Sequence, residues 1–266
     1  MALNEMNFVE QTGKSEFADR LLCLALDVGE GMLKSGGEVH RVEDTVIRIC
    51  HAYGAAHVEI FAISSVVFAA IRMKNGEYSS QMRRVYSTGY HLHQLELYND
   101  VSRTVCRKTP SLDEFNEMIV RVKKTKTYPA WICSLSAGLV AGSLALFFMG
   151  DLWDGLVAAV IGALIFTIDL LPSAHINRLA KTGVQSFVGG LLACFSMKLG
   201  IGHDMEAIMI GTIMVLIPGL SFGTAFRDLL CGDFLAGTLR TVQCILVALM
   251  IAAGYLLAMY FVGGIV

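Results

Sequence analysis

The sequence lacks several patterns that mark common classes of soluble protein. Its seven cysteines are odd in number and never form a C-x-x-C pair, which argues against a disulfide framework or a zinc site. Residues 1–15 contain no basic start followed by an apolar run, so we expect no signal peptide. The formal net charge of −2 offers no basic surface for nucleic acid. These absences favour a chain that starts in a reducing cytoplasm, without metal, cofactor or nucleic acid.

Charge is also scarce, but only in the second half of the chain. Residues 1–128 hold 32 Asp, Glu, Lys and Arg residues, whereas residues 129–266 hold 12. We therefore predict two domains. The first, residues 1–128, is a cytoplasmic α+β domain, and the second, residues 129–266, is an all-α transmembrane domain of five helices.

Local patterns in the first domain predict the order ααβββαα. Apolar residues recur at helical spacing over residues 16–35 and 37–53, and again over 91–108 and 111–124. Runs rich in Val, Ile and Phe predict strands at 57–63 and 65–73, and a third strand is expected at 81–87. Asn75-Gly76 predicts a hairpin turn. Ser35 with Glu38, and Ser111 with Glu114, fit the capping box that starts a helix.

A polar cluster in this domain is the part that most resembles a site. It contains Ser35, Glu38, Arg41 and Glu43. Two interpretations stay open: a solvated helix face with pairs such as Glu38–Arg41, or a functional surface. The histidines of the domain do not have the spacing of a zinc enzyme, so no metal site is predicted.

Five apolar runs in the second half are each near the length needed to cross about 30 Å of hydrocarbon. They cover residues 131–149, 153–171, 184–200, 206–222 and 240–262. Basic residues precede the first run and lie in the loops after the second and fourth, whereas the loops at 150–152 and 201–205 have none. The positive-inside rule therefore predicts a cytoplasmic N-terminus and an outside C-terminus.

The segment 217–240, IPGLSFGTAFRDLLCGDFLAGTLR, concentrates charges and helix breakers between two apolar runs. Such residues are costly in hydrocarbon unless they line a polar cavity or reach the interface. The alternative is an interfacial amphipathic helix whose charges face water. Two interpretations of Asp169 are also open: it is either a functional carboxylate or a boundary residue that reaches the headgroups. The candidate substrate-binding or gating residues are Pro218, Gly219, Thr224, Arg227, Asp228, Asp233, Arg240 and Asp169.

Three passages of this chain resemble the threonine/serine exporter family, in particular its separate N-terminal-type subunits. They are MLKSGGEVHRVEDTVIRICHAYG (32–54), YPAWICSLSAGLVAG (128–142) and the segment 217–240 with its R-D-L-x-x-G-D-x-x-x-G-x-x-R pattern. Thr224 departs from the family, in which many members have Asn. The resemblance implies functional weight for Pro218, Gly219, Arg227, Asp228, Gly232, Asp233, Gly237 and Arg240, and for Ser35, Gly36, Glu38, Arg41 and Glu43.

The resemblance also implies an inner-membrane exporter of threonine and serine, or of dicarboxylates such as succinate, driven by the proton motive force. Many relatives have ten spans, so a second all-membrane subunit is expected, or else a homo-oligomer. In this hypothesis Arg227 or Arg240 holds the substrate carboxylate, and Asp169, Asp228 or Asp233 pairs the arginine or carries a proton. The alternatives are a hydrolase-like enzyme or a sensor domain on a passive membrane anchor. Residues 1–128 show no paired nucleophile and base, so we predict that the chain is not an enzyme.

Overall fold

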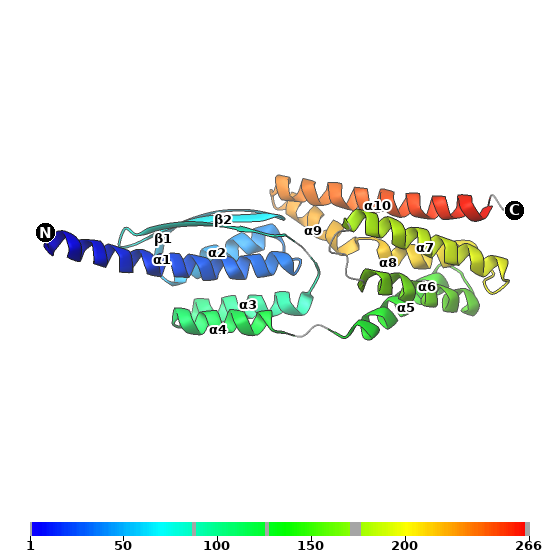
Figure 1. Ribbon diagram of the computed structural model, residues 1–266, viewed down its shortest axis with the longest axis horizontal. Helices are drawn as coiled ribbons and strands as arrows, with labels where there is room; N and C mark the ends of the chain where they lie inside the picture. Colours follow the sequence, from blue (N-terminus) through cyan, green and yellow to red (C-terminus); the bar gives the residue numbers. More distant parts are fainter. Residues whose placement is uncertain (1, 87–88, 126–127, 171–176, 264–266) are drawn as a thin grey trace. The chain divides into compact units, whose positions relative to one another are not determined.

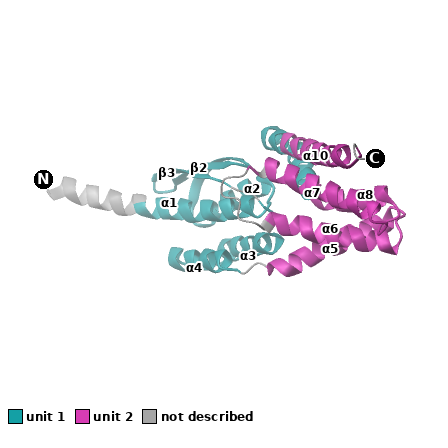
Figure 2. Cartoon of the chain, turned by 45° about the vertical axis from the view of Figure 1, so that its right-hand side comes forward, with its two compact units in different colours: residues 1–126, 220–241 teal, residues 127–219, 242–266 magenta. Residues whose placement is uncertain are grey.

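The computed structural model describes residues 2–86, 89–125, 128–170 and 177–263, and within them the chain is mainly helical with one small sheet (Figure 1). The chain divides into two compact units (Figure 2). Unit 1 comprises residues 1–126 and 220–241, and unit 2 comprises residues 127–219 and 242–266. The segment 220–241 thus packs with the first half of the chain, although it lies between apolar helices in the sequence.

The elements of unit 1 form three layers: the sheet, then α1 and α2, then α3 and α4 (Figure 1). Their bounds are α1 Ala2–Lys34, α2 Val39–Ala52, β1 Ala55–Ile63, β2 Val66–Met73, β3 Tyr78–Arg84, α3 Leu92–Lys108 and α4 Leu112–Lys123. Helix α2 buries Val42, Val46 and Ile49 at helical spacing, while α4 contributes Phe115 and Ile119 to the same core. The middle layer is therefore apolar on both sides and holds the unit together.

The three strands form an antiparallel sheet in the order β1-β2-β3. Gly76 has φ +89°, and the amide of Met73 donates to the carbonyl of Glu77, so the hairpin predicted at Asn75-Gly76 is confirmed. Strand β3 starts three residues earlier than predicted. Ser87, the last residue of the predicted strand, lies outside the described residues.

One of the two predicted capping boxes is confirmed and the other is wrong. Ser111 accepts a hydrogen bond from the amide of Glu114, whose side chain accepts from the amide of Ser111. At the start of α2, by contrast, Glu38 is itself the N-cap residue and its side chain makes no cap. Gly36 has φ +90°, which turns the chain between α1 and α2 and leaves Ser35 buried behind the turn.

Within its described residues, unit 2 contains four helices and most of a fifth, packed closely through small residues. They are α5 Ala130–Phe147, α6 Leu152–Leu170, α7 Arg178–Lys198, α8 Met205–Leu216 and the part of α10 Phe234–Gly263 that follows residue 241. A Cβ atom on Gly142 of α5 would lie 2.7 Å from the carbonyl oxygen of Gly155 in α6, and one on Gly211 of α8 would lie 2.5 Å from that of Ala141. Glycine therefore permits these helix contacts, because small residues let apolar helices approach closely.

Three helices of the described chain are long and apolar enough to cross a membrane: α5, residues 152–169 of α6, and α10. A fourth candidate is the bent pair formed by α8 and α9 (Gly219–Leu230). The prediction of five spans is therefore not confirmed. Helix α7 is long enough, but Lys181, Gln185 and Lys198 lower its mean hydropathy. The end of the second predicted span, at residue 171, lies outside the described residues.

Candidate functional site

The segment that connects α9 to α10 folds back on itself through two glycines. Gly232 has φ +96°, and it follows α9 at a turn in which the amide of Asp233 donates to the carbonyl of Asp228. A Cβ atom on Gly237 would lie 2.6 Å from Cγ of Leu229, so α9 and the start of α10 can approach closely only because this residue is glycine. Ala236 is buried in the core of unit 1. The hairpin of α9 and α10 thus brings its charged residues to α2.

Asp228 is the central residue of this arrangement. Its side chain is 1% exposed, and Oδ1 accepts a hydrogen bond from the amide of Val39 at 3.3 Å. Val39 is the first residue of α2, where an amide has no partner within the helix. A carboxylate there also benefits from the positive end of the helix dipole. Asp228 therefore caps α2 from a distant part of the chain, in place of the missing side-chain cap of Glu38.

Arg240 completes the contact from the first turns of α10. Its Nη1 lies 3.2 Å from Oδ2 of Asp228, and its Nη2 donates to the carbonyl oxygen of Gly37 at 3.1 Å. The Asp228–Arg240 contact is an ion pair whose angles fall short of a hydrogen bond. The Arg240 side chain is 8% exposed, so both charges are removed from water. A buried pair of this kind is sensitive to the loss of either partner.

Arg227, which precedes Asp228 in α9, differs from Arg240 in its exposure. Its Nη1 pairs with Oε1 of Glu38, but 63% of its side chain is exposed. Beside it, the hydroxyl of Tyr90 donates to Oγ of Ser221 at 2.9 Å and lies 3.4 Å from Oγ1 of Thr224. We call Gly37, Glu38, Val39, Arg227, Asp228 and Arg240 the α2–α9 cluster. Within it, Arg227 is the cation that remains open to solvent.

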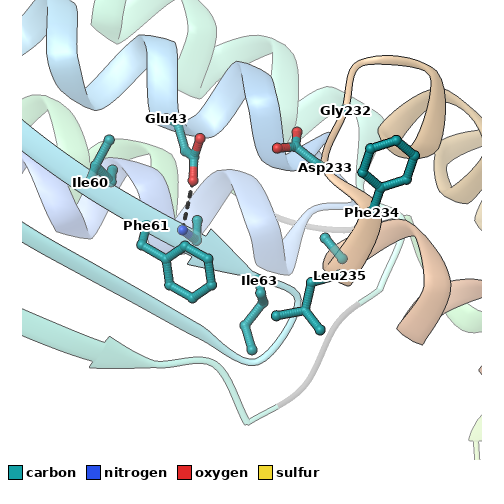
Figure 3. Close-up of a pocket in the computed structure, with 10 residues that line it drawn as sticks. Glu43, Ile60, Phe61, Ile63, Gly232, Asp233, Phe234 and Leu235 are labelled. Atoms are coloured by element: carbon teal, nitrogen blue, oxygen red, sulfur yellow. Dashed lines mark hydrogen bonds between the residues drawn. The ribbon is translucent and has the colours of Figure 1, made fainter.

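A cavity of about 300 Å³ lies on the other side of the α9–α10 turn. Figure 3 shows Glu43 of α2 and Asp233 pointing into it, above Phe61 and Ile63 of β1 and Leu235 of α10, with Phe234 beside Asp233. Oε1 of Glu43 accepts from the amide of Ala62 at 2.7 Å, while Oδ2 of Asp233 is buried without a hydrogen bond. Burial raises the pKa of Glu43, with a smaller contribution from Asp233, against the lowering effect of the Ala62 amide. The cavity is therefore an acidic site with apolar walls.

The remaining predicted residues have other surroundings. Arg41 extends toward α3, where its Nη2 donates to Oδ1 of Asn99 at 3.4 Å. Pro218 lies in the break between α8 and α9, and Gly219 is the first residue of α9. In unit 2, Asp169 is 56% exposed and pairs with Lys181 at 3.3 Å. The alternative in which the charges of segment 217–240 face water is wrong for Asp228 and Arg240, because both are buried.

A second polar cluster in unit 2 joins the loop before α6 to the loop before α8. Oδ1 of Asp154 accepts from the amides of His203 and Asp204 at 2.7 Å and 3.1 Å, and Oδ2 accepts from that of Asp151 at 3.0 Å. Nδ1 of His203 lies 2.5 Å from Oδ2 of Asp151. Asp154 is completely buried. Ligand atoms of Asp151, Asp154 and His203 lie within 4.8 Å of one another, but three backbone amides already occupy Asp154, so its observed role is to fasten the loops.

Several residues of the α2–α9 cluster gave no signal in the sequence. Gly37 and Val39 contribute only backbone atoms, which every residue type carries. Outside the cluster, Tyr90, whose hydroxyl donates to Ser221, lies in a loop with no motif. The side chains of the cluster, by contrast, were all among the predicted site residues.

Comparison with known proteins agrees with the family resemblance that the segment 217–240 indicated. The threonine/serine exporter (ThrE) family model matches residues 23–262. The chain is 24% identical over 233 residues to "Probable succinate transporter subunit YjjP" of Klebsiella aerogenes, covering 86% of this chain and 88% of that protein. It is 22% identical over 241 residues to the protein of the same name in Escherichia coli K12, covering 89% and 92%.

A more distant relative is a fungal protein. "Pheromone-regulated membrane protein 10" of Zygosaccharomyces rouxii is 21% identical over 237 residues, which cover 85% of this chain and 23% of that protein. No solved structure matches the chain. The family model covers nearly all of the sequence, including every residue of the α2–α9 cluster. This chain is therefore a membrane protein that belongs to the threonine/serine exporter family.

Proposed function

We propose that this chain is one subunit of a proton-driven exporter of small carboxylate-bearing metabolites. The candidate substrates are threonine and serine, from the family name, and succinate, from the names of the two bacterial relatives. The observation that carries the proposal is the α2–α9 cluster, in which Asp228 and Arg240 of segment 217–240 contact the backbone at the start of α2. An exporter must select its substrate on the cytoplasmic side, and the positive-inside pattern puts segment 217–240 on that side.

Arg227 is the residue assigned to the substrate carboxylate. Its guanidinium is 63% exposed and holds Glu38 through one nitrogen, so further donors remain for a second carboxylate. Arg240 is unsuited to this role because it is 8% exposed and already engaged by Asp228 and Gly37. In this scheme Arg240 and Asp228 position α9, and Arg227 exchanges Glu38 for substrate. The cytoplasmic unit then acts as an inner gate. This scheme favours the role of a gate over that of a hydrolase or an independent sensor.

Glu43 and Asp233 are the pair assigned to the coupling proton. They share one cavity, and the pKa of Glu43 is raised mainly by burial. A carboxyl whose pKa moves toward neutrality can load and release a proton across a smaller pH difference. Because Asp233 follows Asp228 across the Gly232 turn, protonation in the cavity acts on the same hairpin that carries Arg227.

A second membrane subunit completes the exporter in this proposal. The names of the bacterial relatives call each of them a subunit, and three helices of the described chain are each long and apolar enough to span the membrane on their own. We place the chain in the cytoplasmic membrane with its N-terminus inside and its C-terminus outside. A smaller all-membrane protein encoded beside it is the expected partner, and a homo-oligomer is the alternative.

The test is efflux of radiolabelled threonine and succinate from cells that express the chain with its candidate partner. We expect Arg227→Ala to reduce efflux of the transported compound at least tenfold with unchanged protein abundance. Arg48→Ala is the matched control, because Arg48 is an exposed arginine that pairs with Asp44 within α2. Unchanged efflux in Arg227→Ala would remove Arg227 from the substrate path. Absence of efflux of both compounds from the wild type would reject the exporter itself.

A further inference from the structure

Helix α9 has two unlike faces, and their arrangement is the reverse of an ordinary surface helix. The face toward unit 1 carries Ser221, Thr224 and Asp228, of which Asp228 is buried. The opposite face carries Phe222, Phe226 and Leu230, which are 55%, 57% and 73% exposed. These three residues recur every four positions and so form one continuous stripe along the helix. The polar residues thus bind protein while the large apolar residues point outward.

Exposed apolar residues also occur at the start of the following helix. Phe234 and Leu235 at the start of α10 are 68% and 55% exposed, and Leu239 one turn later is 41% exposed. Contiguous exposed apolar surface of this kind marks a binding site for a protein or a membrane. Helix α10 is itself one of the candidate membrane spans. The exposed apolar residues of α9 are therefore followed directly in the chain by a helix suited to lipid.

Chain connectivity limits what can cover the stripe. Helix α9 starts three residues after the end of α8 and ends four residues before the start of α10. A peptide spans at most about 3.5 Å per residue, so each end of α9 lies within about 10–14 Å of the end of an apolar helix. An amphipathic helix held at that distance reaches the boundary between headgroups and acyl chains. Arg227, at the border of the stripe, is placed to reach lipid phosphate with its exposed guanidinium.

We propose that α9 is an interfacial helix that attaches the cytoplasmic unit to the bilayer. Phe222, Phe226 and Leu230 insert into the acyl-chain boundary of the inner leaflet, and Asp228 on the opposite face caps α2. One helix thereby connects the lipid surface to the first turn of α2, and the lipid is the occupant of the stripe. This placement is independent of which compound the exporter carries.

The test uses tryptophan fluorescence in vesicles of brominated phosphatidylcholine, whose bromine atoms quench tryptophan on contact. The sequence has two tryptophans, so Trp131→Phe and Trp153→Phe give a silent background in the full-length chain. Phe226→Trp is then the reporter, with Phe222→Trp as a second reporter should the first fail to fold. Tyr78→Trp is the control, because Tyr78 is a 62% exposed aromatic residue of β3 in the same unit.

We expect brominated lipid to quench Phe226→Trp at least threefold more than Tyr78→Trp. Bromines near the headgroup end of the acyl chain should quench it more strongly than bromines near the terminal methyl. Equal quenching of reporter and control would overturn the proposal. Stronger quenching by the deep bromines would overturn it too, since α9 would then be part of a span. A third outcome would assign the stripe to a second copy of the chain instead. In that case brominated lipid would not quench Phe226→Trp, and two Phe226→Cys chains would form a disulfide crosslink.

Discussion

Asp228 of α9 accepts a hydrogen bond from the amide of Val39, a residue 189 positions earlier in the chain. This single bond caps the first turn of α2, while the other oxygen of Asp228 faces Arg240 at 3.2 Å. This geometry explains the spacing of Asp228, Gly232, Gly237 and Arg240 in the sequence. Gly232 turns the chain and Gly237 lets the two helices approach, so residues 228 and 240 face each other across the hairpin.

The first prediction concerns the buried ion pair. Asp228→Ala is expected to lower the free energy of unfolding by about 3–5 kcal/mol, because Arg240 would remain buried without a counter-charge. Denaturant titration of the purified protein in detergent, followed by circular dichroism, measures this change. The double variant Asp228→Ala/Arg240→Met is expected to be less destabilised than the sum of the two single variants. Additive effects would mean that the two side chains do not interact.

The second prediction concerns the close approach of α9 and α10. Gly237→Ala is expected to destabilise the protein by about 1–3 kcal/mol, because overpacking forces neighbouring groups to move. The new Cβ would lie 2.9 Å from the backbone nitrogen of Leu229, which cannot rotate away as a side chain could. Thermal unfolding in detergent is the measurement. Gly223→Ala in α9 is the control, since a Cβ there meets nothing within 4 Å, and it is expected to be neutral or stabilising.

Features set by local chemistry were predictable from the sequence. Asn75-Gly76 specifies a turn because Gly76 adopts a positive φ at no steric cost, and Ser111 with Glu114 forms its capping box from atoms three residues apart. Charges next to apolar runs singled out Arg227, Asp228 and Arg240, because burying charge is costly. The resemblance of segment 217–240 to the exporter family added the functional weight of these residues.

Features that join distant backbone atoms were not predictable. Ser35 and Glu38 have the residue types of a capping box, but the positive φ of Gly36 changes the path of the chain and Arg227 engages the Glu38 side chain instead. The partner of Asp228 is an amide, which no residue type encodes. The burial of Asp154 likewise depends on three backbone amides from two loops, whose positions no residue type encodes.

The third prediction concerns Glu43 and pH. A carboxyl with a raised pKa in the folded state costs stability as pH rises from its ordinary value of 4.5 through the raised value. Glu43→Gln removes that cost while its Oε1 can still accept from Ala62. The melting temperature of the variant, relative to wild type, is therefore expected to increase between pH 4.5 and pH 7. Glu59→Gln controls for the loss of one carboxylate on the exposed side of β1. A pH-independent difference for Glu43→Gln would contradict the raised pKa.

The last prediction concerns the His203–Asp151 pair in unit 2. Asp151 raises the pKa of His203 above its ordinary value of 6.5, chiefly through their hydrogen bond. The Asp154 amide, followed by His203, lowers the pKa of Asp151 below its ordinary value of 3.8. Protonated His203 contributes its full stabilisation of the folded state below pH 6.5, and this stabilisation is lost as pH rises through its folded-state pKa. Ionised Asp151 contributes its full stabilisation above pH 3.8, and this stabilisation is lost as pH falls. The pair is thus strongest between these two limits.

His203→Gln tests this window directly. Its melting temperature is expected to lie below that of the wild type at pH 5.5, and the gap is expected to narrow at pH 8.5, because the stabilisation by protonated His203 declines as pH rises through its raised pKa. Thermal unfolding at both pH values is the measurement, and His93→Gln is the control because His93 is an exposed histidine beside Glu96 in α3. Because the His203 and Asp151 side chains are both partly exposed, added salt should narrow the gap at pH 5.5. A gap that widens with pH would mean that neutral His203 is the form that fastens the loops.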